Sequence, residues 1–177
     1  GAWYSGYVSR AVERGIVRGV SEDRFSPEGK LTRAMFVTML GRLYTCSDGS
    51  AVIDGKADFS DVADGSWYAA SARWAAELDI ARGDGERFSP GRDVTREEMA
   101  AMLYRYALSQ GLDTGGGSDL SDYSDAVKAS GWSLEAFKWA DGKGIITGSG
   151  GLLNPRGEAT RAEACALFAR FMDVYGL

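Results

Sequence analysis

The feature that most constrains the fold of this chain is a segment that occurs three times. RFSPEGKLTRAMF at 24–36 returns as RFSPGRDVTREEM at 87–99 and, less closely, as LLNPRGEATRAEA at 152–164. A tryptophan also precedes a glycine by 16 residues in each copy. These pairs are Trp3 and Gly19, Trp67 and Gly83, and Trp132 and Gly148. Agreement of this kind indicates one supersecondary unit that has been copied three times.

The first half of each copy predicts an amphipathic helix. Over 66–78, the sequence SWYAASARWAAEL places Trp67 and Trp74 seven residues apart, with Leu78 beside them on one face. The following Gly83-Asp84-Gly85 stretch suits a left-handed helix end and a tight turn. We expect Trp74, and Trp139 in the next copy, to lie in the core or at its rim.

The second half of each copy predicts another helix, which opens with a threonine cap. Thr95 is followed three residues later by Glu98, and Thr160 by Glu163, which is the pattern of a capping box. Met35 replaces the glutamate in the first copy. We therefore expect that helix to begin less firmly, by about 0.5–1 kcal/mol.

The fold class that we predict is all-α, with three helix-loop-helix repeats arranged with pseudo-threefold symmetry around a central helical bundle. Only isolated β-branched pairs occur, so no substantial sheet is expected, and one repeat alone could hardly bury enough area to be stable. The predicted single unit 1–177 consists of repeat 1 (1–44), repeat 2 (59–109) and repeat 3 (123–177), joined by Gly-, Ser- and Asp-rich linkers at 45–58 and 110–122.

Composition excludes several classes of function. The chain has no histidine, so no Ser-His-Asp or Cys-His nucleophile can be assembled. The net charge of −5 argues against nucleic acid, and no apolar run approaches the roughly 18–20 residues that cross a bilayer. Cys46 and Cys165 lack the spacing of a zinc site; they form a disulfide only if the fold brings them together, and otherwise are half-buried thiols. We expect no metal and no cofactor.

Two other classes also fit poorly. A glycosidase needs two carboxylates in different environments, whereas the recurring polar residues here are threefold. A calcium-dependent docking module would need alternating oxygen ligands ending in a bidentate glutamate, which neither 54–61 nor 83–90 supplies. We therefore expect a protein that is not an enzyme.

The arginine after each threonine is the best candidate for binding. Arg33, Arg96 and Arg161 stand at the positive end of a helix dipole, where a cation is slightly unfavourable. An anion held by the guanidinium group and by the free amides of the helix start would explain this placement. The alternative is an internal ion pair, such as Arg96 with Asp61 or a linker aspartate. For Arg42, Arg105 and Arg170, which lie further along the helices, we expect structural support.

The combined motifs resemble the S-layer homology domain family. Repeat 2 carries FSDV (59–62), WYAASARWA (67–75), IARG (80–83), FSP (88–90) and VTREE (94–98). Repeat 3 carries YSDA (123–126), WSLEAFKWA (132–140), GIITG (144–148), LNP (153–155) and ATRAEA (159–164). The first copy lacks the F-x-D-V segment, so we expect the chain to begin inside its first repeat. The resemblance implies a helical prism at the bacterial cell surface that anchors a fused cargo domain to the wall. Anchoring would be non-covalent, to an acidic, often pyruvylated, secondary cell-wall polysaccharide bound in grooves near the Thr-Arg motifs.

Several alternatives stay open at this point. The tryptophans could stack on a sugar or fill the core. The aspartates could orient an arginine, accept from a sugar hydroxyl, or form turns, and the glycines could serve the backbone alone. The alternative function is a protein-protein docking module of a surface layer or extracellular enzyme complex. The candidate glycan-binding residues are Arg33, Arg96, Arg161, Trp3, Trp67, Trp132, Asp61, Asp125, Thr32, Thr95, Thr160, Gly19, Gly83 and Gly148.

Overall fold

The computed structural model describes residues 1–47 and 53–177, and in these ranges it contains helices and no β-strand. The α-helices are α1 (Ser5–Glu13), α2 (Arg33–Ser47), α3 (Ala69–Glu77), α4 (Arg96–Ser109), α5 (Leu134–Gly142) and α6 (Arg161–Tyr175), with two 3-10 helices, η1 (Ala126–Lys128) and η2 (Gly131–Ser133). The predicted all-α class is confirmed, while the pseudo-threefold symmetry and the repeat boundaries stay predictions. Part of the predicted linker 45–58, residues 48–52, lies outside the described residues.

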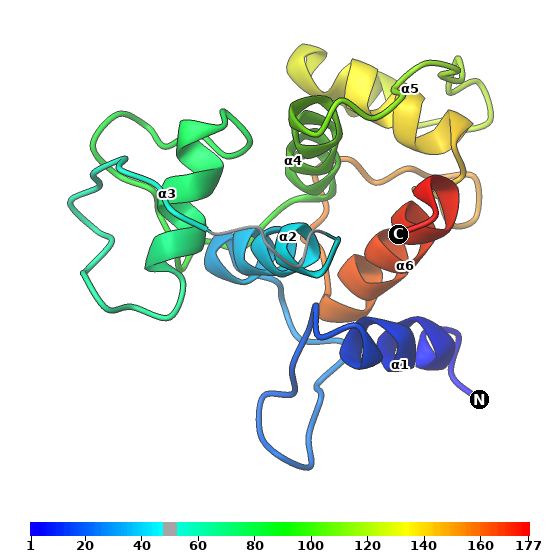
Figure 1. Cartoon of the computed structure of the whole chain (residues 1–177). Coiled ribbons are helices and arrows are strands. Elements are labelled where there is room, and N and C mark those ends of the chain that lie inside the picture. Colours follow the sequence, from blue (N-terminus) through cyan, green and yellow to red (C-terminus); the bar gives the residue numbers. More distant parts are fainter. Residues whose placement is uncertain (48–52) are drawn as a thin grey trace.

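Each short helix packs against a long helix of a different repeat. Helix α3 lies on α2, and α5 lies on α4 (Figure 1). Helix α1 packs on α6, so the first helix of the chain contacts the last. The repeat that is seen in the sequence is therefore not the unit of packing, because each helix pair combines two repeats.

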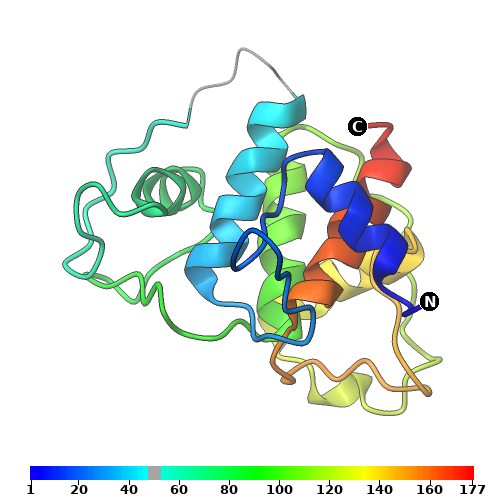
Figure 2. The same ribbon diagram turned by 90° about the horizontal axis from the view of Figure 1, so that it is seen from below.

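The three long helices begin at the same end of the molecule, where backbone hydrogen bonds join them (Figure 2). The amide of Leu31 donates to Ala159 O at 3.0 Å, that of Ala159 to Val94 O at 2.8 Å, and that of Val94 to Leu31 O at 2.8 Å. All three side chains are fully buried. We call this closed set of hydrogen bonds between Leu31, Val94 and Ala159 the ring; it fixes where each Thr-Arg pair lies.

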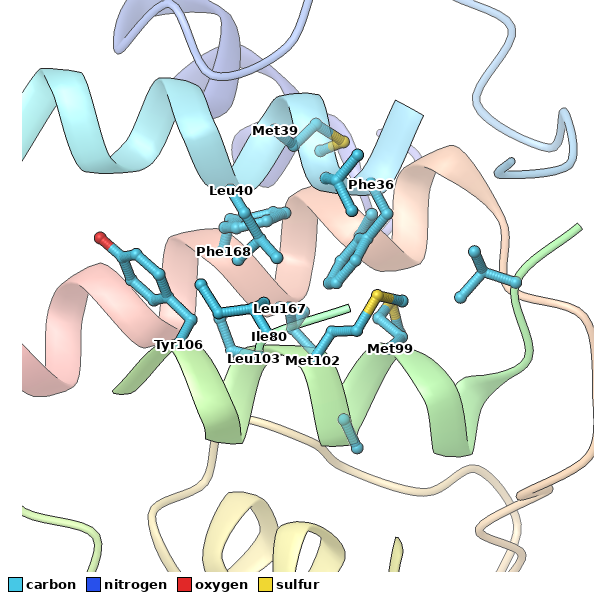
Figure 3. Close-up of a cluster of buried hydrophobic side chains, with 14 of the residues drawn as sticks. Phe36, Met39, Leu40, Ile80, Met99, Met102, Leu103, Tyr106, Leu167 and Phe168 are labelled. Carbon is cyan, nitrogen blue, oxygen red and sulfur yellow. The ribbon is translucent and has the colours of Figure 1, made fainter. Parts of the chain in front are cut away.

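The core fills the space between α2, α4 and α6 (Figure 3). Phe36 of α2 packs on Phe168 of α6, with ring centroids 5.4 Å apart, and Met102 and Leu103 approach from α4. Burial raises the pKa of Tyr106, which also lies in this cluster. Removal of this apolar surface from water provides the main driving force for packing the repeats together.

The tryptophans divide into buried and exposed groups. Trp74 and Trp139 are only 4% and 2% exposed, so they belong to the core. Trp67 is 62% exposed and lies in the turn before α3, which begins at Ala69. The predicted helix over 66–78 is therefore too long, and its tryptophans do not share one face.

The short helices end earlier than predicted. Helix α3 stops at Glu77, and the residue with a left-handed backbone is Asp79, with φ of 59°. Gly15 and Gly144 have φ of 70° and 67° at the matching positions of the other copies. The predicted helix end at Gly83 is wrong, because the chain leaves the helix at the left-handed Asp79, four residues before this glycine.

The capping boxes at two long helices are confirmed. In α4 and α6, the threonine hydroxyl accepts from the glutamate amide, and the glutamate carboxylate accepts from the threonine amide. At α2, Thr32 Oγ1 accepts from the amide of Met35 at 3.3 Å, but methionine offers no carboxylate in return. The weaker start expected for α2 thus has a visible structural basis.

The two cysteines do not form a disulfide. Cys46 is exposed, whereas Cys165 is buried, and burial raises the pKa of its thiol to about 12. The description of both as half-buried thiols is therefore also wrong. Within the described ranges, no helix is long and apolar enough to span a membrane, and no cluster of acidic or cysteine side chains is suited to a metal ion.

Candidate functional site

The repeats meet at three junctions, each defined by the arginine of one Thr-Arg pair. Arg33 marks the first junction, between repeats 1 and 2, and Arg96 marks the second, between repeats 2 and 3. Arg161 marks the third, between repeats 3 and 1. Each arginine reaches across to the loop that precedes the next long helix, so the junctions are built in the same way.

The second junction is hollowed into a groove of about 700 Å³. Arg96 and Glu163 lie in its lining, together with Thr147 and Arg170 of repeat 3 and Trp3 of repeat 1. All three repeats therefore contribute to one groove. The exposed indole of Trp3, 58% accessible, provides an aromatic surface beside the two arginines.

The first junction has a smaller hollow of about 190 Å³ with matching residues. Its lining includes Arg33, Arg82, Glu98, Arg105 and Trp132. Trp132 is 54% exposed. The tryptophans at both grooves therefore lie on the surface, where they can stack against a ligand, and do not fill the core.

Backbone carbonyls hold the Thr-Arg arginines in place. Arg33 donates through Nε to Phe88 O at 3.0 Å and through Nη2 to Arg82 O at 2.8 Å. Arg96 donates in the same way to Leu153 O at 2.9 Å and Thr147 O at 3.4 Å. These charge-assisted hydrogen bonds across the junction join neighbouring repeats.

Arg161 repeats this geometry at the third junction. It donates through Nε to Phe25 O at 3.1 Å and through Nη2 to Arg18 O at 2.6 Å. Its guanidinium carbon lies 4.6 Å from the ring centroid of Phe25. Burial lowers the pKa of Arg161, and also that of Arg33, but an arginine stays charged at neutral pH.

We predicted that the amides at the helix starts would be free to bind an anion, but they are already occupied. The amide of Arg96 donates to Gly157 O and that of Glu97 to Pro155 O, both at 2.9 Å. Equivalent hydrogen bonds occupy the amides of the first two residues of α2 and α6. The prediction is wrong because the loop before the next long helix supplies carbonyls to these donors. An anion at these helix starts would therefore have to be bound by side chains.

The carboxylate partners also differ from the prediction. Arg96 pairs with Glu163 at 2.6 Å, and Arg33 has Glu98 at 4.0 Å, so Asp61 is not the partner of Arg96. Each glutamate is the capping-box residue of the next long helix. One side chain therefore both caps its helix and neutralises an arginine from the neighbouring repeat.

Asp61 and Asp125 instead support the loops. Asp125 accepts from the amides of Leu153 at 2.7 Å and Asn154 at 2.9 Å. Burial would raise the pKa of Asp125, but these two hydrogen bonds outweigh it and hold the pKa below its ordinary value. Asp61 accepts from the two equivalent amides of repeat 2, with the same effect on its pKa.

The candidate glycines serve close packing of the backbone. A Cβ on Gly148 would lie 2.3 Å from Tyr123 Cε1 and 2.5 Å from Leu152 O. Gly83 and Gly19 are crowded in the same way, the latter by Ser21 O at 2.5 Å. Gly148 also lines the groove of the second junction, so this close approach shapes the groove wall.

The second set of arginines, for which structural support was predicted, also contributes to the grooves. Arg105 and Arg170 line the two grooves, and Arg170 donates to Thr147 Oγ1 at 3.0 Å. An interval of nine residues turns an α-helix by about 900°, which leaves Arg105 on the opposite face from Arg96. Each long helix thus offers one arginine to each of two junctions. The repeated interval in the sequence could have revealed this.

The sequence matches the S-layer homology domain over residues 1–35, 58–100 and 122–165. The chain belongs to the S-layer homology domain family. The matched segments contain all three exposed tryptophans and all three Thr-Arg pairs.

Known relatives carry this S-layer homology region as a small part of larger proteins. An amylopullulanase of Thermoanaerobacterium thermosulfurigenes is 33% identical over 99% of this chain but only 9% of its own length. The S-layer protein sap of Bacillus anthracis is 27% identical over 98% of the chain and 20% of its own length. A cellulosome-anchoring protein of Acetivibrio thermocellus is 26% identical over 89% of this chain and 35% of its own length.

One further residue distinguishes repeat 2 of this S-layer homology domain. Glu97 is buried and accepts from Ser130 N at 2.9 Å, Ser130 Oγ at 3.1 Å and Ser133 Oγ at 3.2 Å. These hydrogen bonds fix the turn that carries Trp132 over the first junction. The other repeats have alanine at this position, so no repeated pattern in the sequence pointed to Glu97.

Proposed function

We propose that this domain anchors a bacterial surface protein non-covalently to the cell wall by binding an acidic polysaccharide at its junctions. The names of the S-layer and cellulosome-anchoring relatives support a role at the cell surface. The chain would lie outside the cell and would be joined to cargo domains, in keeping with the small share that it covers of its longer relatives. Its own chemistry would be binding, with no catalytic step.

The observation that carries this proposal is the groove of the second junction. It brings the exposed Trp3 indole together with the guanidinium groups of Arg96 and Arg170. An indole face suits the apolar face of a sugar ring, and a guanidinium fork suits a carboxylate such as that of a pyruvyl group. A saccharide that carries an acidic substituent would satisfy both features at once.

Several such grooves would act together on a polymer. The domain's net charge of −5 does not prevent binding, because the local arginines decide the potential inside a groove. A repetitive polysaccharide can occupy two junctions of one domain, and the second contact then becomes intramolecular. Weak individual sites would in this way give firm retention.

The proposal is tested by sedimentation with purified cell walls. A variant with Trp3→Ala and Arg170→Gln should bind about tenfold or more weakly, because it loses the stacking surface and one cation of the groove. Val127→Ala with Arg156→Gln is the matched control, since both residues are exposed and line neither groove. The control should bind like the parent domain, and both variants should keep their helical circular dichroism.

The same assay separates polysaccharide binding from protein docking. Walls stripped of their secondary polysaccharide should no longer retain the parent domain. Retention on stripped walls, or full binding by the Trp3 and Arg170 variant, would contradict the proposal.

A further inference from the structure

The third junction differs from the other two in its charges. Met35 stands where the first and second junctions have Glu98 and Glu163. Gly15 stands where the first junction has Asp79, which pairs with Arg82. Two carboxylates that neutralise arginines elsewhere are therefore replaced by uncharged residues here.

Three arginines, Arg18, Arg42 and Arg161, nevertheless belong to this junction. Arg161 donates to Arg18 O at 2.6 Å, and Arg42 donates through Nη1 to Ile16 O at 3.3 Å. Their acceptors lie two residues apart on one short segment, and Arg18 is itself part of that segment. Burial lowers the pKa of Arg42. The positive charge of Arg18 lowers it further, as expected for neighbouring cations.

These cations have no carboxylate counter-ion in the part of the chain that the structure describes. At the second junction, Arg96 Nη1 donates to Glu163 at 2.6 Å. At the third, Arg161 Nη1 has no hydrogen-bond partner among the described residues. No buried side-chain nitrogen or oxygen of the described residues lacks a partner, so this nitrogen keeps contact with solvent. The second junction therefore holds two arginines against one glutamate, and the third holds three arginines against none.

We infer that the third junction is the strongest anion site of the domain and prefers a doubly charged group of the phosphate type to a single carboxylate. An anion that enters the other junctions approaches a fixed glutamate, whereas none opposes it here. Attraction grows with the product of the charges, so a dianion gains most at a junction to which three arginines and no paired carboxylate contribute. This inference rests on the proposed function only in assigning the anion to a wall polymer.

The test follows the side-chain Nε–Hε resonances of the three Thr-Arg arginines by NMR while inorganic phosphate is added. The buffer is held well above the second pKa of phosphate. The Arg161 resonance should shift at a concentration about tenfold lower than that needed for Arg96. Acetate at equal ionic strength should shift Arg161 only at higher concentrations than phosphate.

A matched pair of variants isolates the missing counter-ion. Met35→Glu restores the residue of the other junctions and should weaken phosphate binding at Arg161 about tenfold, whereas Met35→Gln should leave it nearly unchanged. The glutamate completes a capping box, so this variant should fold at least as stably. In the reverse direction, Glu163→Gln should strengthen phosphate binding at Arg96.

Equal phosphate affinities at Arg161 and Arg96, or equal effects of the two Met35 substitutions, would overturn the inference. Equal responses of Arg161 to acetate and phosphate would overturn the preference for a dianion. If phosphate binds as expected but walls are not retained, the proposed function fails and this site stands. If the domain is retained on walls but phosphate shifts all three resonances together, the inference about the third junction fails and the proposed function stands.

Discussion

The helix starts and the tryptophan-bearing turns lie close together, but they are built in opposite ways. At the helix starts, Arg33 and Arg161 are nearly buried, and the ring joins all three repeats. In the turns, Trp3, Trp67 and Trp132 are more than half exposed. The difference shows that the recurring residues have two tasks: the arginines mainly hold repeats together, and the tryptophans contribute mainly to the surface.

The largest effect that separates these two regions should come from Arg33→Ala. The substitution removes two charge-assisted hydrogen bonds and leaves Phe88 O and Arg82 O without this donor. We expect the free energy of unfolding to fall by about 3 kcal/mol or more, as measured by urea denaturation. Arg156→Ala, at an exposed position, is the control and should change it by less than about 0.5 kcal/mol. Equal stability of the two variants would show that the helix-start arginines are not structural.

A smaller effect is expected from Asp125→Asn, and it should depend on pH. The folded protein holds the pKa of Asp125 below its ordinary value, so the carboxylate stabilises the fold above the unfolded pKa. This contribution is lost as the pH falls through the folded pKa. At neutral pH the variant should lose about 1–2 kcal/mol of unfolding free energy, and the two proteins should converge in acid. A difference that is constant from neutral to acidic pH would contradict this role for the carboxylate.

Local features of the molecule could be predicted from the sequence, because they depend on neighbouring residues. The capping boxes at Thr95 and Thr160 need four consecutive positions, and the all-α class follows from repeated helical patterns. Helix ends were less predictable: a left-handed Asp79 ended α3 before the glycine that the sequence favoured. Short helices that gain their stability from packing can end wherever the chain must turn.

The partners across the junctions could not be predicted, because they depend on how distant segments pack. The guanidinium of Arg33 meets Phe88 O and Glu98 from another repeat, and no local pattern specifies such a meeting. The same holds for the carbonyls that occupy the helix-start amides. Glu97 could not be predicted for a different reason: the other repeats have alanine at this position, so no recurring pattern points to it.

The most direct test measures the unfolding free energy and the wall affinity of Trp132→Ala in the same preparation. The exposed indole contributes little to the packing of the core, so the unfolding free energy should stay within about 0.5 kcal/mol of the parent value. Wall affinity should nevertheless fall several-fold, up to about tenfold, because the first groove loses its aromatic surface. Unchanged affinity, or a loss of affinity that merely accompanies unfolding, would contradict the division between a structural ring and a binding surface.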